Sequence, residues 1–119
     1  HGHAAVARRL ERLPAWVRQR CRIGVNVGKN KDSEEAEADY QAGIAAFNSL
    51  ADYLVINISS PNTPGLRALQ KKASLQRLLE TCAGTLARQT SPRPLFLKIA
   101  PDLEADEVGE IVETAQGAG

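Results

Sequence analysis

The sequence predicts an α/β fold built from parallel β/α units. Segments with helical spacing of apolar residues alternate with short apolar runs, in the order helix, strand, helix, strand, helix, strand, helix. Each predicted strand also carries a polar residue at or near its end: Asn26, Asn57 or Lys98. Because parallel strands end at one edge of their sheet, we expect these side chains to lie at the edge where β/α barrels build their sites.

The first predicted helix spans residues 4–19. Val6, Leu10 and Leu13 form its apolar stripe, and arginines fill the other face. Pro14 marks a break or a fresh first turn. We interpret the arginines as a solvated helix face, with a patch that binds polyanions as the alternative.

The first predicted strand spans residues 22–27. Side chains alternate along a strand, so Gly24, Asn26 and Gly28 share a face that leaves room for a flat ligand, and the intervening apolar residues face the outer helices. The segment 28–31 lacks the glycine spacing and the Lys-Ser/Thr ending of a P-loop. We therefore reject a nucleotide-binding P-loop.

A helix is predicted next, capped by Asp32 or Ser33 and running to about Leu50. Acidic residues in its first turn suit the positive end of the helix dipole. We interpret them as a solvated helix start, with a paired-carboxylate site as the alternative. They are Glu34, Glu35 and Glu37.

The rest of the chain predicts strands over residues 53–58 and 95–99, each followed by a helix, over 70–88 and 103–114. A lysine inside an apolar strand is costly unless it is paired or solvated. Lys98 is therefore expected to point at an anionic or electron-rich group. The alternative is an edge strand with this lysine in water.

Composition limits the classes of function. The chain has 119 residues and a net charge of +1, with no concentrated basic patch for nucleic acid. It has no apolar run long enough for a transmembrane helix and no signal peptide pattern. Cys21 and Cys82 are interpreted as reduced thiols, with a disulfide left open, and His1 and His3 as solvated. No metal site is predicted.

The loop after the central strand is the most informative stretch. Its two prolines, Pro61 and Pro64, stiffen it and bias the preceding residues toward extended backbone. A stiff loop can hold hydroxyl and amide groups in place for a ligand. The buried amide of Asn57, just before the loop, suits the same task. An ordinary turn is the alternative reading of this composition.

Three motifs in this order carry a resemblance to a known family. They are Asn57 to Arg67, the run Gly-Val-Asn-Val-Gly-Lys-Asn-Lys at 24–31, and Leu-Lys-Ile-Ala-Pro-Asp at 97–102. Together they resemble dihydroorotate dehydrogenase of the quinone-dependent class (class 2). The resemblance implies a TIM-type (β/α)8 barrel, of which about three strands fall within this chain. It also implies FMN as cofactor and a role in pyrimidine biosynthesis.

The resemblance also implies roles for individual residues. Asn26, Asn57 and Lys98 correspond to groups that contact the flavin, and Asn57 and Asn62 to amides that bind dihydroorotate or orotate. Ser60 corresponds to the general base. The soluble class 1 enzymes carry a cysteine at this position, so the serine favours the quinone-dependent class.

A complete eight-stranded barrel needs roughly 200 to 250 residues. Residues 1–119 are therefore expected to be part of a barrel domain truncated at both ends, and inactive alone. The complete enzyme is expected to pass electrons to a quinone, as a peripheral protein on the cytoplasmic face of the bacterial inner membrane. The alternatives are another FMN-dependent pyrimidine oxidoreductase barrel and a non-catalytic fragment that associates with itself through open strand edges.

Overall fold

The computed structural model describes residues 2–30, 33, 35–63 and 65–118. The expectations that concern His1, Asp32, Glu34 and Pro64 lie outside these residues. In chain order the elements are α1 (His3–Glu11), α2 (Ala15–Arg20), β1 (Gly24–Val27), α3 (Ala36–Phe47), β2 (Tyr53–Asn57), the 3-10 helix η1 (Arg67–Gln70), α4 (Lys72–Ala87), β3 (Leu95–Lys98) and α5 (Ala105–Gly117).

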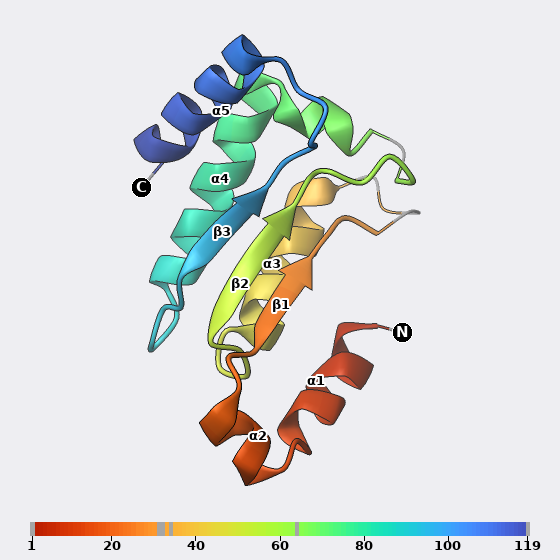
Figure 1. Ribbon diagram of the computed structural model, residues 1–119, viewed down its shortest axis with the longest axis vertical. Helices are drawn as coiled ribbons and strands as arrows, with labels where there is room; N and C mark the ends of the chain where they lie inside the picture. The colour runs from red at the N-terminus through yellow and green to blue at the C-terminus, as the bar shows by residue number, and fades with distance from the viewer. Residues whose placement is uncertain (1, 31–32, 34, 64, 119) are drawn as a thin grey trace.

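The strands form a parallel sheet in the order β1-β2-β3, so the predicted α/β class and strand direction are confirmed. Figure 1 shows the arrows running in one direction, with α3 and α4 behind the sheet and no helix of the described residues in front of it. Helices α3 and α4 also pack against each other. The sheet therefore has one covered face and one open face.

The core lies between the covered face and these helices. Its fully buried side chains alternate along β2, where Leu54 and Ile56 point inward, and line the inner faces of α3 and α4. Gly43 lets α3 approach the sheet closely, because a Cβ at this position would overlap the side chain of Val27. The helical core residues are Tyr40, Ile44, Leu75, Leu78 and Cys82.

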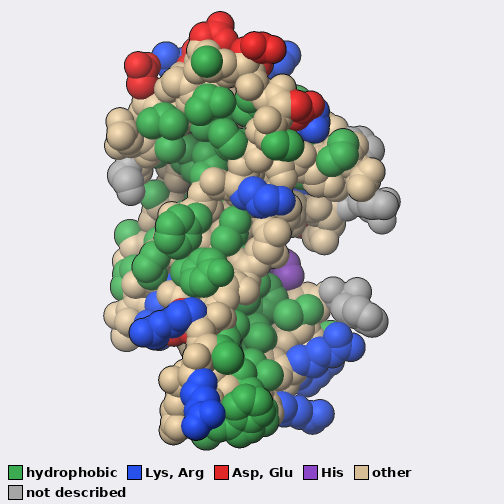
Figure 2. All heavy atoms as spheres, in the orientation of Figure 1, with side chains coloured by type: hydrophobic (Ala, Val, Ile, Leu, Met, Phe, Trp, Pro, Cys, Tyr) green, Lys and Arg blue, Asp and Glu red, His purple; other side chains and the backbone are tan. Residues whose placement is uncertain are grey.

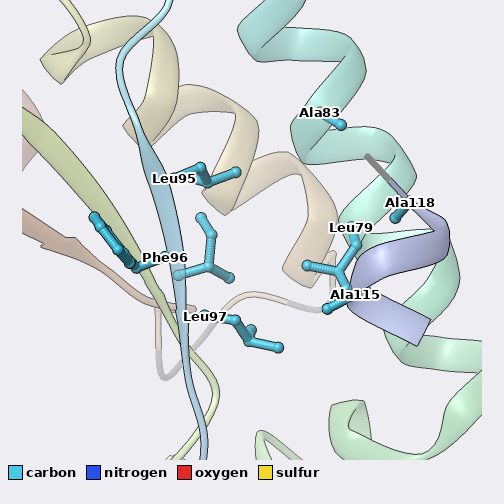
Figure 3. A pocket seen from close by; sticks show the side chains of 8 residues that line it. Leu79, Ala83, Leu95, Phe96, Leu97, Ala115 and Ala118 are labelled. Carbon is cyan, nitrogen blue, oxygen red and sulfur yellow. The ribbon is translucent and has the colours of Figure 1, made fainter. Parts of the chain in front are cut away.

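Strand β3 follows the predicted alternation. Figure 3 shows Leu95 and Leu97 on the side of α4 and α5, and Phe96 on the opposite side. An apolar hollow between β3 and these helices has a volume of about 130 Å³. Phe96 is 56% exposed because its face of the sheet is open.

Two helix boundaries at the amino-terminal side of the sheet bear on the predictions. The break at Pro14 is confirmed, because this residue precedes the first turn of α2. The predicted start of α3 is wrong: the helix begins at Ala36, and the Ser33 hydroxyl donates to the Glu35 carbonyl without capping the helix. A local hydrogen bond of this kind competes with helix formation.

Helix α5 begins two residues later than predicted, at Ala105, and runs on to Gly117. A capping box explains this start. The Glu107 carboxylate accepts a hydrogen bond from the backbone N–H of Glu104, 2.8 Å away, and the Glu104 side chain accepts one in return from the Glu107 backbone N–H. The acidic first turn also suits the helix dipole.

The remaining predictions concern membranes, metals and thiols. Among the described residues, no helix is both long and apolar enough to cross a membrane. The same part of the chain brings together no group of three His, Cys, Asp or Glu side chains that could hold a metal ion. Cys21 is exposed and Cys82 is buried, and both are free thiols.

Candidate functional site

The predicted polar residues lie on the open face of the sheet, toward the carboxyl ends of the strands. Asn57 and Lys98 are Cα partners across β2 and β3, and Asn26 is paired with Val55, two residues before Asn57. Asn26 and Lys98 are exposed, and Asn57 is partly exposed. Figure 2 shows hydrophobic side chains gathered over this open face. The structure therefore places three of the predicted residues on one wall.

The hydroxyl of Ser59 joins Asn57 to Lys98. Ser59 Oγ donates to Asn57 Oδ1 at 2.7 Å, and the Ser59 backbone N–H donates to the same oxygen at 3.0 Å. Lys98 Nζ donates to Ser59 Oγ at 3.3 Å. Lys98 is predicted either to point at an electron-rich group or to lie in water on an edge strand, and each expectation is met in part. Strand β3 is an edge of this sheet, and the Lys98 ammonium nevertheless has a polar partner.

The backbone of Asn57 is fixed from the covered side of the sheet. The Tyr40 hydroxyl, on α3, donates to the Asn57 carbonyl at 2.8 Å. Tyr40 is completely buried, and burial raises the pKa of its hydroxyl far above the usual range, so the hydroxyl stays protonated and remains a donor. The helix thereby holds the last residue of β2 in position.

Ser60 and Asn62 follow in the adjacent loop. The backbone N–H of Asn62 donates to Ser60 Oγ at 3.2 Å, and the side chain of Asn62 is exposed. Ser60 also lines an open hollow of about 350 Å³ with Thr63 and Arg67. Within the described ranges, no hydrogen bond joins the Ser60 or Asn62 side chain to Asn57 or Lys98. Ser60 and Asn62 therefore lie next to the hydrogen bonds that join Asn57, Ser59 and Lys98 and take no part in them.

Contacts between η1 and the loop after β3 hold the carboxyl ends of β2 and β3 together. Arg67 donates to the Asp102 carboxylate at 3.1 Å, and this hydrogen bond lowers the pKa of Asp102. Gln70 Oε1 accepts a hydrogen bond from the Ala100 backbone N–H at 2.9 Å. The loop after β2 is therefore tied to the loop after β3.

One sequence-based expectation for this face fails at one end of β1. The face of Gly24, Asn26 and Gly28 is expected to leave room for a flat ligand, but a Cβ at Gly24 would overlap the ring of Tyr53, its partner across the ladder. That ring packs edge to face against Phe96, with centroids 5.6 Å apart. The space over Gly28 is open, since the nearest atom to a Cβ there is the Asn57 carbonyl oxygen at 4.0 Å. Free space therefore lies at the carboxyl end of β1.

Comparisons with known proteins show the family to which this chain belongs. The family model described as dihydroorotate dehydrogenase matches residues 1–119. The chain belongs to the dihydroorotate dehydrogenase family. It is 52% identical over 121 residues to the dihydroorotate dehydrogenase (quinone) of Parvibaculum lavamentivorans, covering 99% of this chain and 32% of that protein. The protein of the same name from Rhodospirillum rubrum is 48% identical over 120 residues.

Solved structures of dihydroorotate dehydrogenase carry the same fold. The Eimeria tenella enzyme in complex with ferulenol superposes with a TM-score of 0.88 at 38% identity, covering 100% of this chain and 38% of that one. Its ligand-free form gives 0.87 at 39% identity. The three parallel strands are therefore part of a TIM-type barrel, as predicted. The chain spans about a third of the length of the curated relatives that it matches.

The donor set fits the flavin that the dihydroorotate dehydrogenase resemblance implies. Asn26 and Lys98 stand exposed on the open face. Oδ1 of Asn57 accepts two hydrogen bonds, and no described residue accepts one from its Nδ2 group. A flavin ring carries carbonyl oxygens and ring nitrogens that accept such bonds, and a lysine nearby stabilises negative charge on the reduced ring. The residues present therefore fit the group.

Sequence reasoning missed three contributors to this candidate site. Ser59 and Tyr40 make their contacts through the strand register and the packing of α3, which composition does not reveal. Gln70 likewise depends on a loop contact. One local signal existed: an Asn whose side chain accepts from the backbone N–H two residues on forms an Asx turn, which predicts the tight link from Asn57 to Ser59.

Proposed function

We propose that the protein carrying this chain is a quinone-dependent dihydroorotate dehydrogenase, which oxidises dihydroorotate to orotate in pyrimidine biosynthesis. The observation that carries the proposal is the family match over the whole chain, combined with Asn57 and Lys98 paired in register on an open sheet face. The names of the relatives support the choice of a quinone as acceptor.

FMN is the proposed cofactor, and when bound it supplies the hydride acceptor. Asn26 and Asn57 would donate hydrogen bonds to its ring. Lys98 would place a positive charge beside the ring and stabilise the negative charge that develops there. These assignments are supported by the exposure of Asn26 and Lys98 on one face and by the free donors of Asn57.

Ser60 is the proposed general base, with Asn57 and Asn62 as substrate-binding amides. Dihydroorotate loses a hydride from one ring carbon and a proton from the adjacent carbon, which leaves a double bond between them. Ser60 Oγ would take the proton from the ring carbon while its own hydroxyl proton passes to solvent. Serine is a poor base, so the backbone N–H of Asn62 that donates to this oxygen is relevant, because it stabilises the negative charge that forms on Oγ as the hydroxyl proton leaves.

The transfer of electrons to the quinone is assigned to parts of the protein other than the residues named above. Quinones that accept electrons from such enzymes are dissolved in membranes, so we propose peripheral attachment at the cytoplasmic face of the bacterial inner membrane. The relatives' names support the quinone, and an acceptor dissolved in the membrane supports a location at the membrane surface.

We further propose that residues 1–119 form part of a barrel domain and do not turn over alone. The support is the open face: Phe96 is 56% exposed on the side that a closed barrel buries. The chain alone is instead expected to associate with itself through this apolar face and the free edges of β1 and β3. Size-exclusion chromatography with light scattering at several concentrations tests this expectation.

Anaerobic absorbance spectroscopy tests the proposed activity. The complete protein is loaded with FMN and mixed with dihydroorotate, and the flavin band is expected to bleach and to recover when a soluble quinone is added. Ser60→Ala is expected to slow bleaching at least a hundredfold while leaving FMN bound. A protein that binds FMN but never bleaches with dihydroorotate would contradict the proposal.

The same assay separates the rival pyrimidine oxidoreductase. Dihydrouracil lacks the carboxylate of dihydroorotate and is the matched control substrate. Bleaching by dihydroorotate alone supports the proposed enzyme. Bleaching by dihydrouracil at an equal or greater rate would favour the rival, since the carboxylate then contributes nothing to recognition.

A further inference from the structure

We propose that Ser59 is a positioning residue, which holds the Asn57 amide and the Lys98 ammonium so that both present only hydrogen-bond donors to the ligand. The identity of the ligand rests on the proposed function. The orientation of the two groups rests on contacts within the described chain.

The orientation of the Asn57 amide follows from its partners. Its Oδ1 accepts from the Ser59 backbone N–H at 3.0 Å and from Ser59 Oγ at 2.7 Å. Rotating the amide by half a turn would place its NH2 group against the backbone donor, which cannot reverse its role. The backbone N–H therefore fixes Oδ1 toward Ser59, and the two Nδ2–H bonds point away from it.

The proton of the Ser59 hydroxyl determines the direction of the hydrogen bond between Ser59 and Lys98. A serine hydroxyl has one proton, and here it is donated to Asn57 Oδ1, so only lone pairs remain for Lys98. Lys98 Nζ lies 3.3 Å from this oxygen and donates one of its three N–H bonds to it. Ser59 is only 8% exposed, so water competes poorly for these bonds.

A row of donors results along the ends of β2 and β3. The Asn57 amide offers two N–H bonds and the Lys98 ammonium keeps two more, and the Ser59 oxygen between them is largely buried and already accepts a hydrogen bond from Lys98. Such a row selects a ring edge built from carbonyl oxygens and unprotonated nitrogens. An edge carrying N–H groups would leave donors facing donors, which is strongly unfavourable.

Side-chain replacement at Ser59 in the complete FMN-loaded protein tests the positioning role. Ser59→Ala removes both hydroxyl bonds and is expected to weaken FMN binding and slow bleaching by dihydroorotate about ten- to hundredfold. Ser59→Thr keeps the hydroxyl and is expected to recover most of the loss. The matched control is Ser49→Ala, because Ser49 is exposed in the turn before β2. Unchanged FMN binding and bleaching in Ser59→Ala would overturn the inference.

A second readout needs neither a variant nor turnover. The ¹⁵N order parameter of the Asn57 side-chain amide in the unmutated protein without substrate is expected to be about 0.8 or higher, as for rigid backbone, whereas a value below about 0.6 would overturn the inference. If dihydroorotate does not bleach the unmutated protein, the proposed function fails, and this readout still decides whether the Asn57 amide is held rigidly, as the positioning role requires. Normal bleaching together with a mobile Asn57 amide would refute the positioning role alone.

Discussion

Asn57 and Lys98 are Cα partners across β2 and β3, and one hydroxyl, that of Ser59, lies within hydrogen-bonding distance of both side chains. The pair connects two strands that are separated by a helix of 16 residues, α4. The parallel register therefore assembles in space a site that the sequence distributes over distant segments.

Lys98 is expected to matter for function and hardly at all for stability. Lys98→Met should reduce the bleaching rate of the FMN-loaded protein about 10²- to 10³-fold, because a charge aimed at the developing negative charge is lost. The free energy of unfolding should change by less than about 0.5 kcal/mol, because the side chain is exposed. Stopped-flow absorbance and urea denaturation measure the two effects. A large loss of stability with unchanged bleaching would contradict this assignment.

Tyr40 is expected to stabilise the end of β2. Tyr40→Phe removes the buried donor to the Asn57 carbonyl and should lower the free energy of unfolding by about 1–3 kcal/mol, because that carbonyl loses a partner. Tyr53→Phe is the matched control, since Tyr53 is only partly buried on the open face. Urea denaturation of both variants makes the comparison, and equal losses would show that the Tyr40 hydroxyl has no special role.

Gly43 and Gly109 should respond to alanine in opposite directions. A Cβ at Gly43 would overlap Val27, a β-branched side chain on a strand, so Gly43→Ala should cost about 1–3 kcal/mol. Gly109 lies within α5 with open space around it, so Gly109→Ala should stabilise by about 0.5–1 kcal/mol through helix propensity. Thermal unfolding of the two variants tests the close packing of α3 on β1. A stabilising Gly43→Ala would contradict it.

The two thiols should differ sharply in reactivity. Burial raises the pKa of Cys82 to about 12, so almost no thiolate exists at neutral pH, and the sulfur is also shielded from reagents. Cys21 is exposed. Iodoacetamide followed by peptide mass spectrometry should show alkylation at Cys21 within minutes and at Cys82 only after denaturation. Rapid alkylation of Cys82 in the native protein would mean that the core between α3 and α4 opens.

Asp52 should make the free energy of unfolding depend on pH in the acidic range. The Ile23 backbone N–H donates to its carboxylate at 2.8 Å, and this bond, with Arg22 nearby, lowers the pKa of Asp52 below its usual 3.8. The contribution to stability is therefore fully present above about pH 4 and is lost as the pH falls through the lowered value. The urea midpoint of Asp52→Asn should fall less steeply below pH 4 than that of the unmutated chain. Identical slopes would contradict the account.

Local patterning predicts the parts of the fold that depend on alternation. Leu95 and Leu97 face the helices and Phe96 faces the open side, as the strand period requires. The start of α3 is not predictable in this way, because Asp39 accepts hydrogen bonds from the backbone and side chain of Asn30, an arrangement formed only in the folded loop. Local signals for a helix cap therefore placed the helix start too early.

The candidate site likewise has parts that a local sequence pattern predicts and parts that it does not. Asn26, Asn57 and Lys98 are predictable because each stands near the end of a strand, and parallel strands end together. The bridge from Ser59 to Lys98 joins positions 39 residues apart, and the ring of Tyr53 over Gly24 follows from the partner strand. Both depend on the register between strands, and no local pattern in the sequence encodes that register.

The crystal structure of the complete protein with FMN and orotate tests the central claim most directly. The account predicts that the flavin ring lies over the open face, within about 3.5 Å of Asn57 Nδ2 and Lys98 Nζ, with the Ser60 hydroxyl facing the pyrimidine ring. A flavin bound elsewhere, with Asn57 and Lys98 turned toward other protein groups, would contradict the claim that these strand ends form the wall of a flavin site.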